Sequence, residues 1–383
     1  MHRIRLFLKN FVSVVFAPIL FIACVRPSSK TPANEKINLS PTITAISQSA
    51  LSPSLLAEWT IGEVHNTAWS PDSGMFAVNY WLEGSDSNSF VQAFDVRSLE
   101  EMWTAENSLA SDLVFTPDGQ FIVEPNLAAP YFYWRSVENG KVVRQGEITS
   151  VNQIERGGCN GGAQVILANV RNNTALTVDF RDLLGPSWGT QNMVVVRQLD
   201  LETGKCKELF DYQGSFDLFD LNSSGTLLAY GGVGLEEDEV IIWDVEEQTE
   251  VCRTPQVDFG RFVPGENTLA VVRGGKIVFV DASMCQELRA LDIAPAFGDE
   301  TSVAFSPDGR WFAIEKESVL IVETSTGETL TQITIPENAS LKSITFFLSS
   351  IRFSPNGRYL LIALYSTDDI YAGIVQLWQL KPQ

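Results

Sequence analysis

The chain offers few residues that could carry catalytic chemistry. Only two histidines occur in 383 residues, and His2 lies in the N-terminal segment, so His65 is the single imidazole in the rest of the chain. A serine triad or a multi-histidine metal site would depend on that one side chain. The Gly-x-Ser-x-Gly pattern around Ser187 has neither the helix nor the later histidine that the motif requires. We therefore expect no catalytic residue and interpret His65 as part of an inner strand.

Metal-binding patterns are equally sparse. No two of the five cysteines stand in a Cys-x-x-Cys spacing, which argues against a structural zinc site. The acidic run 236–239 contains oxygen ligands of the kind that calcium prefers. It lacks the alternating acidic spacing of an EF-hand loop. The sequence therefore predicts neither a metal site nor a cofactor.

A repeated turn phrase organises most of the chain. Ser70-Pro71-Asp72-Ser73-Gly74 returns at 116–119, 306–309 and 354–357, with degenerate copies at 222–225 and 263–266. Ser, Pro and Gly are favoured at the first, second and fourth positions of a type I turn. Each copy lies between two apolar runs, so each predicts a tight hairpin. A spacing of roughly 40–50 residues indicates a repeat array.

The rest of each repeat completes a four-stranded unit. An apolar run such as 240–243 ends at an acidic residue, and a polar turn and a short strand follow. Seven such units predict an all-β fold, a seven-bladed β-propeller of four-stranded antiparallel blades. The third unit lacks the Pro-Asp-Gly turn, and we place its first strand near Val165. The last unit ends after its third strand, 374–378, and the upstream segment 56–61 is expected to add the outer strand that closes the ring.

The Trp243-Asp244 pair and the Ser-Pro-Asp-Gly turns resemble the WD-repeat (tryptophan–aspartate) β-propeller family over nearly everything after residue 54. TolB-like propellers share the turn phrase and are a close second. The Gly-His pair usual in WD repeats is missing from every unit, so the family's His–Asp hydrogen-bond tetrad does not carry over. The resemblance implies a platform for protein interactions rather than an enzyme.

The N-terminal segment has the layout of a secretory signal. Three basic residues precede a short apolar run, 11–23. Ala23-Cys24 resembles the bacterial lipoprotein box, although Phe21 replaces the usual leucine. We predict a lipoprotein-type signal peptide over 1–23 and a lipid on Cys24. A plain signal peptide and an uncleaved anchor are the alternatives.

Three consecutive regions follow from this pattern. Residues 24–54 are rich in Ser, Thr, Pro and Asn, as a flexible tether would be. Residues 55–383 form the propeller. The protein is thus predicted to lie outside the cytoplasm, bound to the cell membrane through its N-terminal lipid.

Four cysteines remain after Cys24, which allows two disulfides in an exported chain. Cys206, Cys252 and Cys285 fall near the starts of outer strands in successive blades, where the geometry disfavours pairing among them. We therefore expect Cys159 and Cys206, both in the third unit, to be the candidate pair.

The charge of the chain limits its partners. It carries 47 acidic and 27 basic residues, a formal net charge of −20. Such a charge opposes binding to nucleic acid, whose affinity depends on Lys and Arg at phosphates. It suits a basic protein, a cation or a neutral ligand, and it also serves solubility.

Acidic and aromatic residues gather in the loops that join the second and third strands of the blades. In the WD-repeat family these loops share one face of the ring, and exposed Trp and Tyr beside charges are typical of protein interfaces. The candidate partner-binding residues are Trp81, Glu83, Asp86, Tyr131, Trp188, Glu236, Glu237, Asp238, Glu239, Asp368 and Asp369.

The sequence therefore predicts a non-enzymatic scaffold of the cell envelope that binds a protein partner through this acidic and aromatic face. Two alternatives stay open. One is a lactonase-like hydrolase with a divalent metal in the central channel, and the other is a carbohydrate-binding propeller that stacks sugars on exposed aromatic rings.

Overall fold

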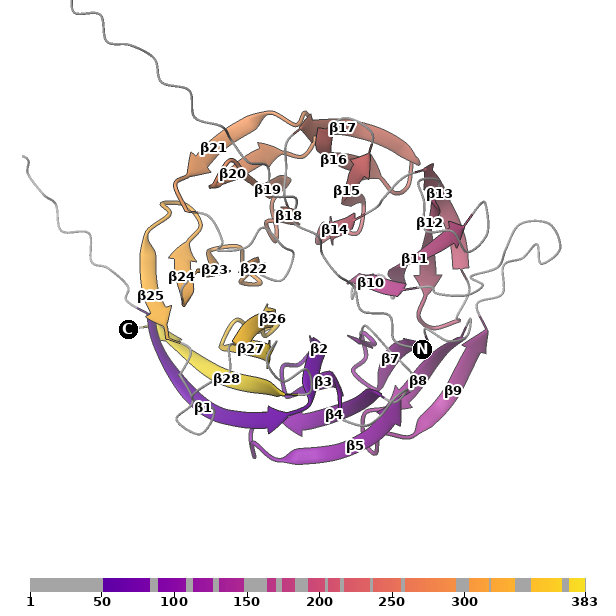
Figure 1. Ribbon diagram of the computed structural model, residues 1–383, viewed down its shortest axis with the longest axis vertical. Helices are drawn as coiled ribbons and strands as arrows, with labels where there is room; N and C mark the ends of the chain where they lie inside the picture. Colours follow the sequence, from indigo (N-terminus) through magenta and orange to yellow (C-terminus); the bar gives the residue numbers. More distant parts are fainter. Residues whose placement is uncertain are drawn as a thin grey trace, which may run out of the picture. The chain divides into compact units, whose positions relative to one another are not determined.

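The computed structural model describes residues 51–82, 89–107, 113–126, 131–147, 164–169, 174–182, 192–203, 206–213, 217–234, 237–255, 259–293, 303–316, 318–334, 346–366 and 372–382. In these ranges the chain forms strands β1 to β28, arranged in seven four-stranded antiparallel sheets. Figure 1 shows the sheets placed as blades around a central axis. The described part of the chain contains no helix long and apolar enough to pass through a membrane. The predicted seven-bladed fold is confirmed.

The first three blades follow one another along the chain. Blade 1 contains β2 (Glu63–Trp69), β3 (Met75–Trp81), β4 (Ser89–Asp95) and β5 (Glu101–Asn107). Blade 2 contains β6 (Val114–Phe115), β7 (Phe121–Asn126), β8 (Tyr131–Ser136) and β9 (Val142–Glu147). Blade 3 contains β10 (Gln164–Asn169), β11 (Thr174–Asp182), β12 (Asn192–Asp200) and β13 (Cys206–Gln213), so its first strand lies at Val165 as predicted.

The next three blades repeat this order. Blade 4 contains β14 (Asp217–Leu221), β15 (Leu227–Gly234), β16 (Glu237–Asp244) and β17 (Thr249–Pro255). Blade 5 contains β18 (Phe259–Phe262), β19 (Thr268–Arg273), β20 (Lys276–Asp281) and β21 (Glu287–Leu291). Blade 6 contains β22 (Val303–Phe305), β23 (Trp311–Glu315), β24 (Val319–Glu323) and β25 (Thr329–Ile333). In each blade we call the four strands a, b, c and d from the channel outward.

Blade 7 joins the two ends of the described chain. Its strands a, b and c are β26 (Phe346–Phe353), β27 (Tyr359–Ser366) and β28 (Gly373–Pro382), and its strand d is β1 (Leu51–Ile61). The antiparallel register runs from Leu51 opposite Pro382 to Ile61 opposite Gly373. In Figure 1 the indigo β1 lies beside the yellow β28. Strand β1 begins at Leu51, four residues before the start that the sequence suggested for the propeller.

Side-chain hydrogen bonds explain the repeated turn phrase. The Ser70 hydroxyl donates to Asp72 Oδ1 (2.7 Å) and accepts from the Met75 amide (2.9 Å). Thr116, Ser306 and Ser354 make the same pair of bonds in blades 2, 6 and 7. The left-handed backbone position belongs to a glycine in the later copies, whereas Ser73 occupies it in the first (φ 62°). The phrase therefore forms the turn between strands a and b, as the pattern predicted, and hydrogen bonds among its own residues stabilise it.

The acidic residue at the end of strand c closes the second kind of turn. Asp244 Oδ1 accepts the amides of Glu246 (2.9 Å) and Glu247 (2.8 Å). Asp95 and Asp200 hold the c–d turns of blades 1 and 3 in the same way. Asp and Asn are favoured in such turns because their oxygens bond the backbone two or three residues on. The aromatic–acidic pair thus marks the end of strand c, and the acidic side chain stabilises the turn that follows.

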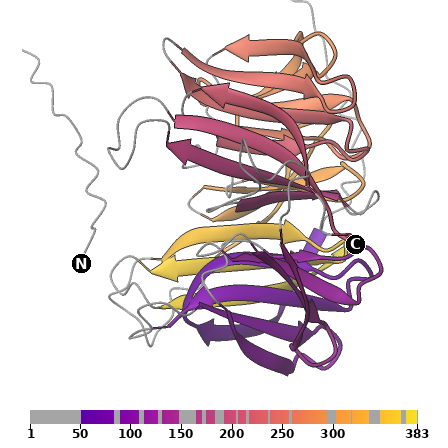
Figure 2. The same cartoon turned by 90° about the vertical axis from the view of Figure 1, so that its right-hand side faces the viewer.

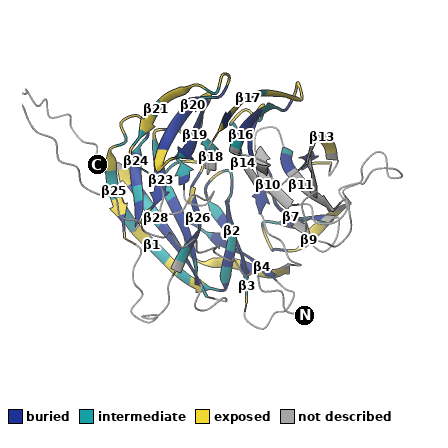
Figure 3. Ribbon diagram, turned by 45° about the horizontal axis from the view of Figure 1, so that its top comes forward, coloured by how far each residue is buried: buried dark blue, intermediate teal, exposed yellow. Residues whose placement is uncertain are grey.

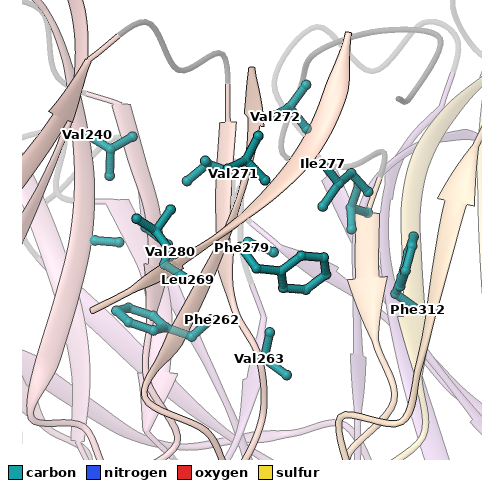
Figure 4. Packing of buried hydrophobic residues seen from close by; sticks show 14 of the residues in the cluster. Val240, Phe262, Val263, Leu269, Val271, Val272, Ile277, Phe279, Val280 and Phe312 are labelled. Atoms are coloured by element: carbon teal, nitrogen blue, oxygen red, sulfur yellow. The ribbon is translucent and has the colours of Figure 1, made fainter. Parts of the chain in front are cut away.

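The hydrophobic core lies between adjacent blades rather than inside any one of them. Figure 4 shows one cluster, in which Val240 of blade 4, Phe279 of blade 5 and Phe312 of blade 6 belong to a single buried set. Figure 3 shows β19 and β20 largely buried and the outer strand β21 mostly exposed. In the side view of Figure 2 the strands cross the thickness of the ring. Because each face is buried by its neighbour, the blades depend on one another for stability.

A disulfide joins blades 4 and 5 and corrects one expectation. Cys252 in β17 is bonded to Cys285, with their Cα atoms 5.8 Å apart. The expectation that these cysteines lie too far apart was wrong, because Cys285 lies in the c–d turn of blade 5, before β21 begins. The pair is strand to turn rather than strand to strand. The candidate partner Cys159 lies outside the described residues, and Cys206 is the first residue of β13.

Candidate functional site

The candidate partner-binding residues map to one edge of the sheets. Trp81 ends strand b of blade 1, Tyr131 begins strand c of blade 2, and Glu237 begins strand c of blade 4. The b–c connection of blade 7 lies between β27 and β28. All of these are b–c junctions, which the common blade topology places on the same side of the ring, here called the b–c face. Glu83, Asp86, Trp188, Glu236, Asp368 and Asp369 lie outside the described residues, as does the Ser187 motif.

In blade 1 the b–c face contains a half-buried aromatic pair. The His65 and Trp81 rings lie 4.3 Å apart at 48°. His65 Nε2 and Trp81 Nε1 are buried and have no hydrogen-bond partner in the described part of the chain. Burial lowers the pKa of His65 to about 4. The imidazole is thus neutral at pH 7 and belongs to inner strand β2, as expected for a structural residue.

Three residues of the acidic run of blade 4 lie in a strand. We expected residues 236–239 in a loop, but Glu237, Asp238 and Glu239 begin β16 and pair with Gly234, Val233 and Gly232. Arg253 Nη1 binds Glu239 at 3.0 Å, and its Nη2 binds Glu250 at 2.6 Å. Glu239 is therefore partly neutralised by a neighbour on the next strand.

The central channel holds a second set of polar groups, at the opposite side of the ring. A cavity of about 520 Å³ lies where the inner strands reach the a–b turns. Its walls come from the inner strands of blades 1, 2, 4, 5, 6 and 7, and from the turn prolines Pro71, Pro264 and Pro355. It is therefore the mouth of the channel at the a–b side, here called the channel mouth.

Residues at one repeated position form a ring around the channel mouth. The last residue of strand a is aromatic in five blades and Leu221 in blade 4, and the residue before it lines the cavity. These lining residues are Ala68, Val114, Asp220, Arg261, Ala304 and Arg352. Three of them are charged and three are short and apolar.

Asp220 is bonded to two backbone amides and lies near one arginine of this ring. Its Oδ2 accepts the Phe262 amide at 2.8 Å and its Oδ1 accepts the Leu221 amide at 2.9 Å. Arg261 Nη1 lies 3.6 Å from Oδ1, with only 18% of the Asp220 side chain and 20% of the Arg261 side chain exposed. Burial raises the pKa of Asp220, and the positive charges of Arg261 and Arg352 oppose that rise.

Arg352 approaches from blade 7 and is held by blade 1. Its Nη2 donates to Asn66 Oδ1 at 3.1 Å, and the same oxygen accepts the Thr67 amide at 2.6 Å. The Trp69 indole donates to the Arg352 carbonyl at 3.3 Å. These bonds join the first and last inner strands beside the channel mouth.

Sequence reasoning missed the channel mouth. In the sequence, the channel mouth is marked only by the residue before the last residue of each strand a. That residue is charged at Asp220, Arg261 and Arg352. Among the residues that the structure describes, no three His, Cys, Asp or Glu side chains cluster as metal ligands would.

The architecture defines a seven-bladed β-propeller, and comparison with solved structures agrees with that fold. One chain of the mitotic checkpoint complex is 15% identical, with a TM-score of 0.58 over 95% of this chain and 98% of that chain. The Myceliophteria thermophila Cps50 (Swd1) β-propeller domain is 12% identical, with a TM-score of 0.54 over 86% and 100% of the two chains. The Dos1 propeller is 11% identical, with a TM-score of 0.54 over 85% and 95%.

At these identities the likeness defines the fold alone. No protein-family model and no curated protein matches the chain.

Proposed function

We propose that the protein is a non-enzymatic scaffold of the bacterial cell envelope that binds another protein through its b–c face. The observation that carries the proposal is that Trp81, Tyr131 and the start of strand β16 lie at b–c junctions of three different blades, on the same side of the ring. Rigid strands ending in variable loops are a common basis for binding sites. One similar structure is a chain of a multiprotein assembly, the mitotic checkpoint complex, which is consistent with this use of the fold.

The disulfide between Cys252 and Cys285 supports a location outside the cytoplasm. Disulfides persist in oxidising compartments and are rare in reducing ones. Together with the signal-like N-terminus, this favours export, with a lipid on Cys24 holding the protein at the membrane. The Cys24→Ser variant should move from the membrane fraction to the soluble fraction and lose the mass of the lipid. Full membrane retention at unchanged size would contradict the lipid anchor.

Partner binding can be tested with two matched charge reversals in blade 4. The full-length protein, tagged at its C-terminus, would be crosslinked in its source organism and the captured proteins identified by mass spectrometry. Glu237→Lys with Glu239→Lys alters the b–c face. Glu246→Lys with Glu247→Lys makes the same change of charge in the exposed c–d turn at the other side.

We expect a partner that the wild type and the c–d variant capture and the b–c variant loses. Equal capture by all three proteins would place the interface elsewhere, and no specific partner at all would count against a scaffold. A Trp81→Ala variant provides an independent, uncharged test of the same face.

A further inference from the structure

One outer strand of the ring differs from the others in charge. Among the strands d that the structure describes, β5, β9, β13, β17 and β21 each carry at least two charged residues, and β1 carries Glu58. Strand β25 of blade 6, Thr329–Ile333, carries none, and Glu328 directly precedes it. The chain as a whole has a net charge of −20. Strand β25 is therefore an uncharged part of the rim of an acidic protein.

The outer edge of β25 faces away from the ring. The strand pairs with β24 on its inner side and with no other strand of those that the structure describes. The buried side chain of Ile333 belongs to the same hydrophobic cluster as Leu51 of β1, and Figure 1 shows β25 at the rim next to β1. Thr329 and Gln332 are exposed. The core thus holds the strand in place while its outer edge is open to a further strand.

The regular part of this edge is short and centred on Gln332. A bulge at Leu330 interrupts the start of the strand, and the regular ladder then runs from Thr331 to Ile333. Proteins protect sheet edges from pairing with bulges, prolines and charged side chains. Every strand d of the ring has the bulge. Strand β25 has neither a proline nor a charge in addition, so it is the least protected edge that the structure describes.

The charge pattern favours a second copy of this chain as the occupant of the edge. A basic partner gains most from acidic surface, which β25 does not offer. Two copies repel each other over most of their acidic surface, so an uncharged strand is where they can approach. A two-fold axis lets the same edge serve both copies. A lipid surface fits less well, because β25 exposes no large apolar side chain.

We propose that two copies of the chain pair edge to edge through β25, antiparallel, with the two-fold axis close to Gln332. The outer backbone groups of the two strands then exchange hydrogen bonds, as in other cases of strand addition. Antiparallel pairing places the two copies of Glu328 at opposite ends of the contact. The contact lies on the rim and leaves both b–c faces free, so the inference does not depend on the scaffold proposed above.

Co-isolation of two tagged forms of the full-length protein tests the proposal. The two forms, with different C-terminal tags, would be produced together in the source organism, solubilised in detergent and isolated through one tag. The amount of the second tag then reports self-association. We expect the wild-type forms to isolate together.

Charge substitutions at Gln332 then locate the contact. Gln332→Glu in both forms, or Gln332→Lys in both forms, places like charges next to the two-fold axis and should weaken self-association about 10-fold or more. Gln332→Glu in one form and Gln332→Lys in the other should restore it, which also shows that both variants fold. Gln145→Glu is the matched control, because Gln145 is exposed and occupies the same position of β9, second after the bulge. It should leave self-association unchanged.

Several outcomes would overturn the proposal. One is a wild type whose two forms do not isolate together, and another is equal co-isolation of the wild type and both Gln332 variants. A loss that the mixed pair does not restore would assign the edge to a different protein. Binding to anionic lipid vesicles that Gln332→Lys strengthens and Gln332→Glu weakens, with self-association unchanged, would assign it to a lipid surface.

Discussion

The contact between blades 1 and 2 and the contact between blades 4 and 5 use the same two positions of the fold with different chemistry. One position is the strand-d residue just after the bulge, and the other is the left-handed residue in the c–d turn of the next blade. Trp103 and Gly140 fill them between blades 1 and 2. Cys252 and Cys285 fill them between blades 4 and 5.

The two contacts divide the available volume differently. The Trp103 indole donates to the Val137 carbonyl at 2.7 Å and lies over Gly140 (φ 70°), where an added Cβ would be 2.5 Å from the ring. Cys285 (φ 53°) keeps its Cβ because a small cysteine faces it. Between blades 7 and 1 the division is reversed, with Ala57 on the strand and Leu99 (φ 62°) in the turn.

The comparison indicates that the fold fixes where neighbouring blades touch, whereas each sequence pair decides how. In these three contacts the large Trp103 on the strand faces a glycine in the turn, whereas the small Cys252 and Ala57 face turn residues that carry a side chain despite the cost of a left-handed backbone. The disulfide between Cys252 and Cys285 joins the two blades without a bulky side chain at either position. This interpretation predicts different responses of the two regions to mutation, reductant and acid.

Truncating the aromatic contact should have the largest effect. Trp103→Ala removes a buried ring and its hydrogen bond, and should lower the free energy of unfolding by about 4 kcal/mol. Trp103→Phe keeps most of the packing and should cost about 1–2 kcal/mol. Urea titrations followed by circular dichroism measure both. A Trp103→Ala variant as stable as the wild type would show that this contact carries little of the ring's stability.

Breaking the disulfide should be next in size. Cys252 and Cys285 are 33 residues apart, and closing a loop of that length stabilises a fold by about 3–4 kcal/mol in the chain-entropy model. Dithiothreitol should therefore lower the melting temperature of the wild type, and Cys252→Ser with Cys285→Ser should abolish that response. Cys206→Ser, matched in chemistry, should keep it. An unchanged melting temperature in reductant would mean that this contact holds without its bond.

Acid should act on blade 1 and spare the disulfide contact. Burial lowers the pKa of His65 from 6.5 to about 4. The unfolded chain binds this proton below pH 6.5 and the folded chain only near pH 4, so stability is lost as the pH falls through that window. The loss should approach about 3 kcal/mol. His65→Phe, which keeps a ring against Trp81, should remove it, and the difference between the two pH profiles isolates His65 from the carboxylates. Parallel profiles would contradict the assignment.

The turns explain why the fold could be predicted from the sequence. Ser70 and Asp72 act through their own backbone, so their pattern is legible in five consecutive residues. The contacts between blades cannot be recognised in this way, because Trp103 and Gly140 meet only after separate strands have packed. Cys285 shows the same limit. It lies in the turn before the outer strand, not at the start of that strand as we expected, and this position brings it next to Cys252. Arg261 and Arg352 were missed because they are 91 residues apart in the sequence. They come to line the same cavity only when the blades close into a ring.

The smallest effect should be the coupling between the two positions of one contact. Gly140→Leu in the wild type places a side chain against the Trp103 ring and should be destabilising. In the Trp103→Ala background the same change reproduces the Ala57–Leu99 arrangement, so its cost should shrink, with a coupling free energy of about 1–2 kcal/mol in a double-mutant cycle. Gly140→Ser serves as a smaller probe of the left-handed backbone alone. Additive effects would show that volume is not shared across the contact, and that its glycine serves only the turn.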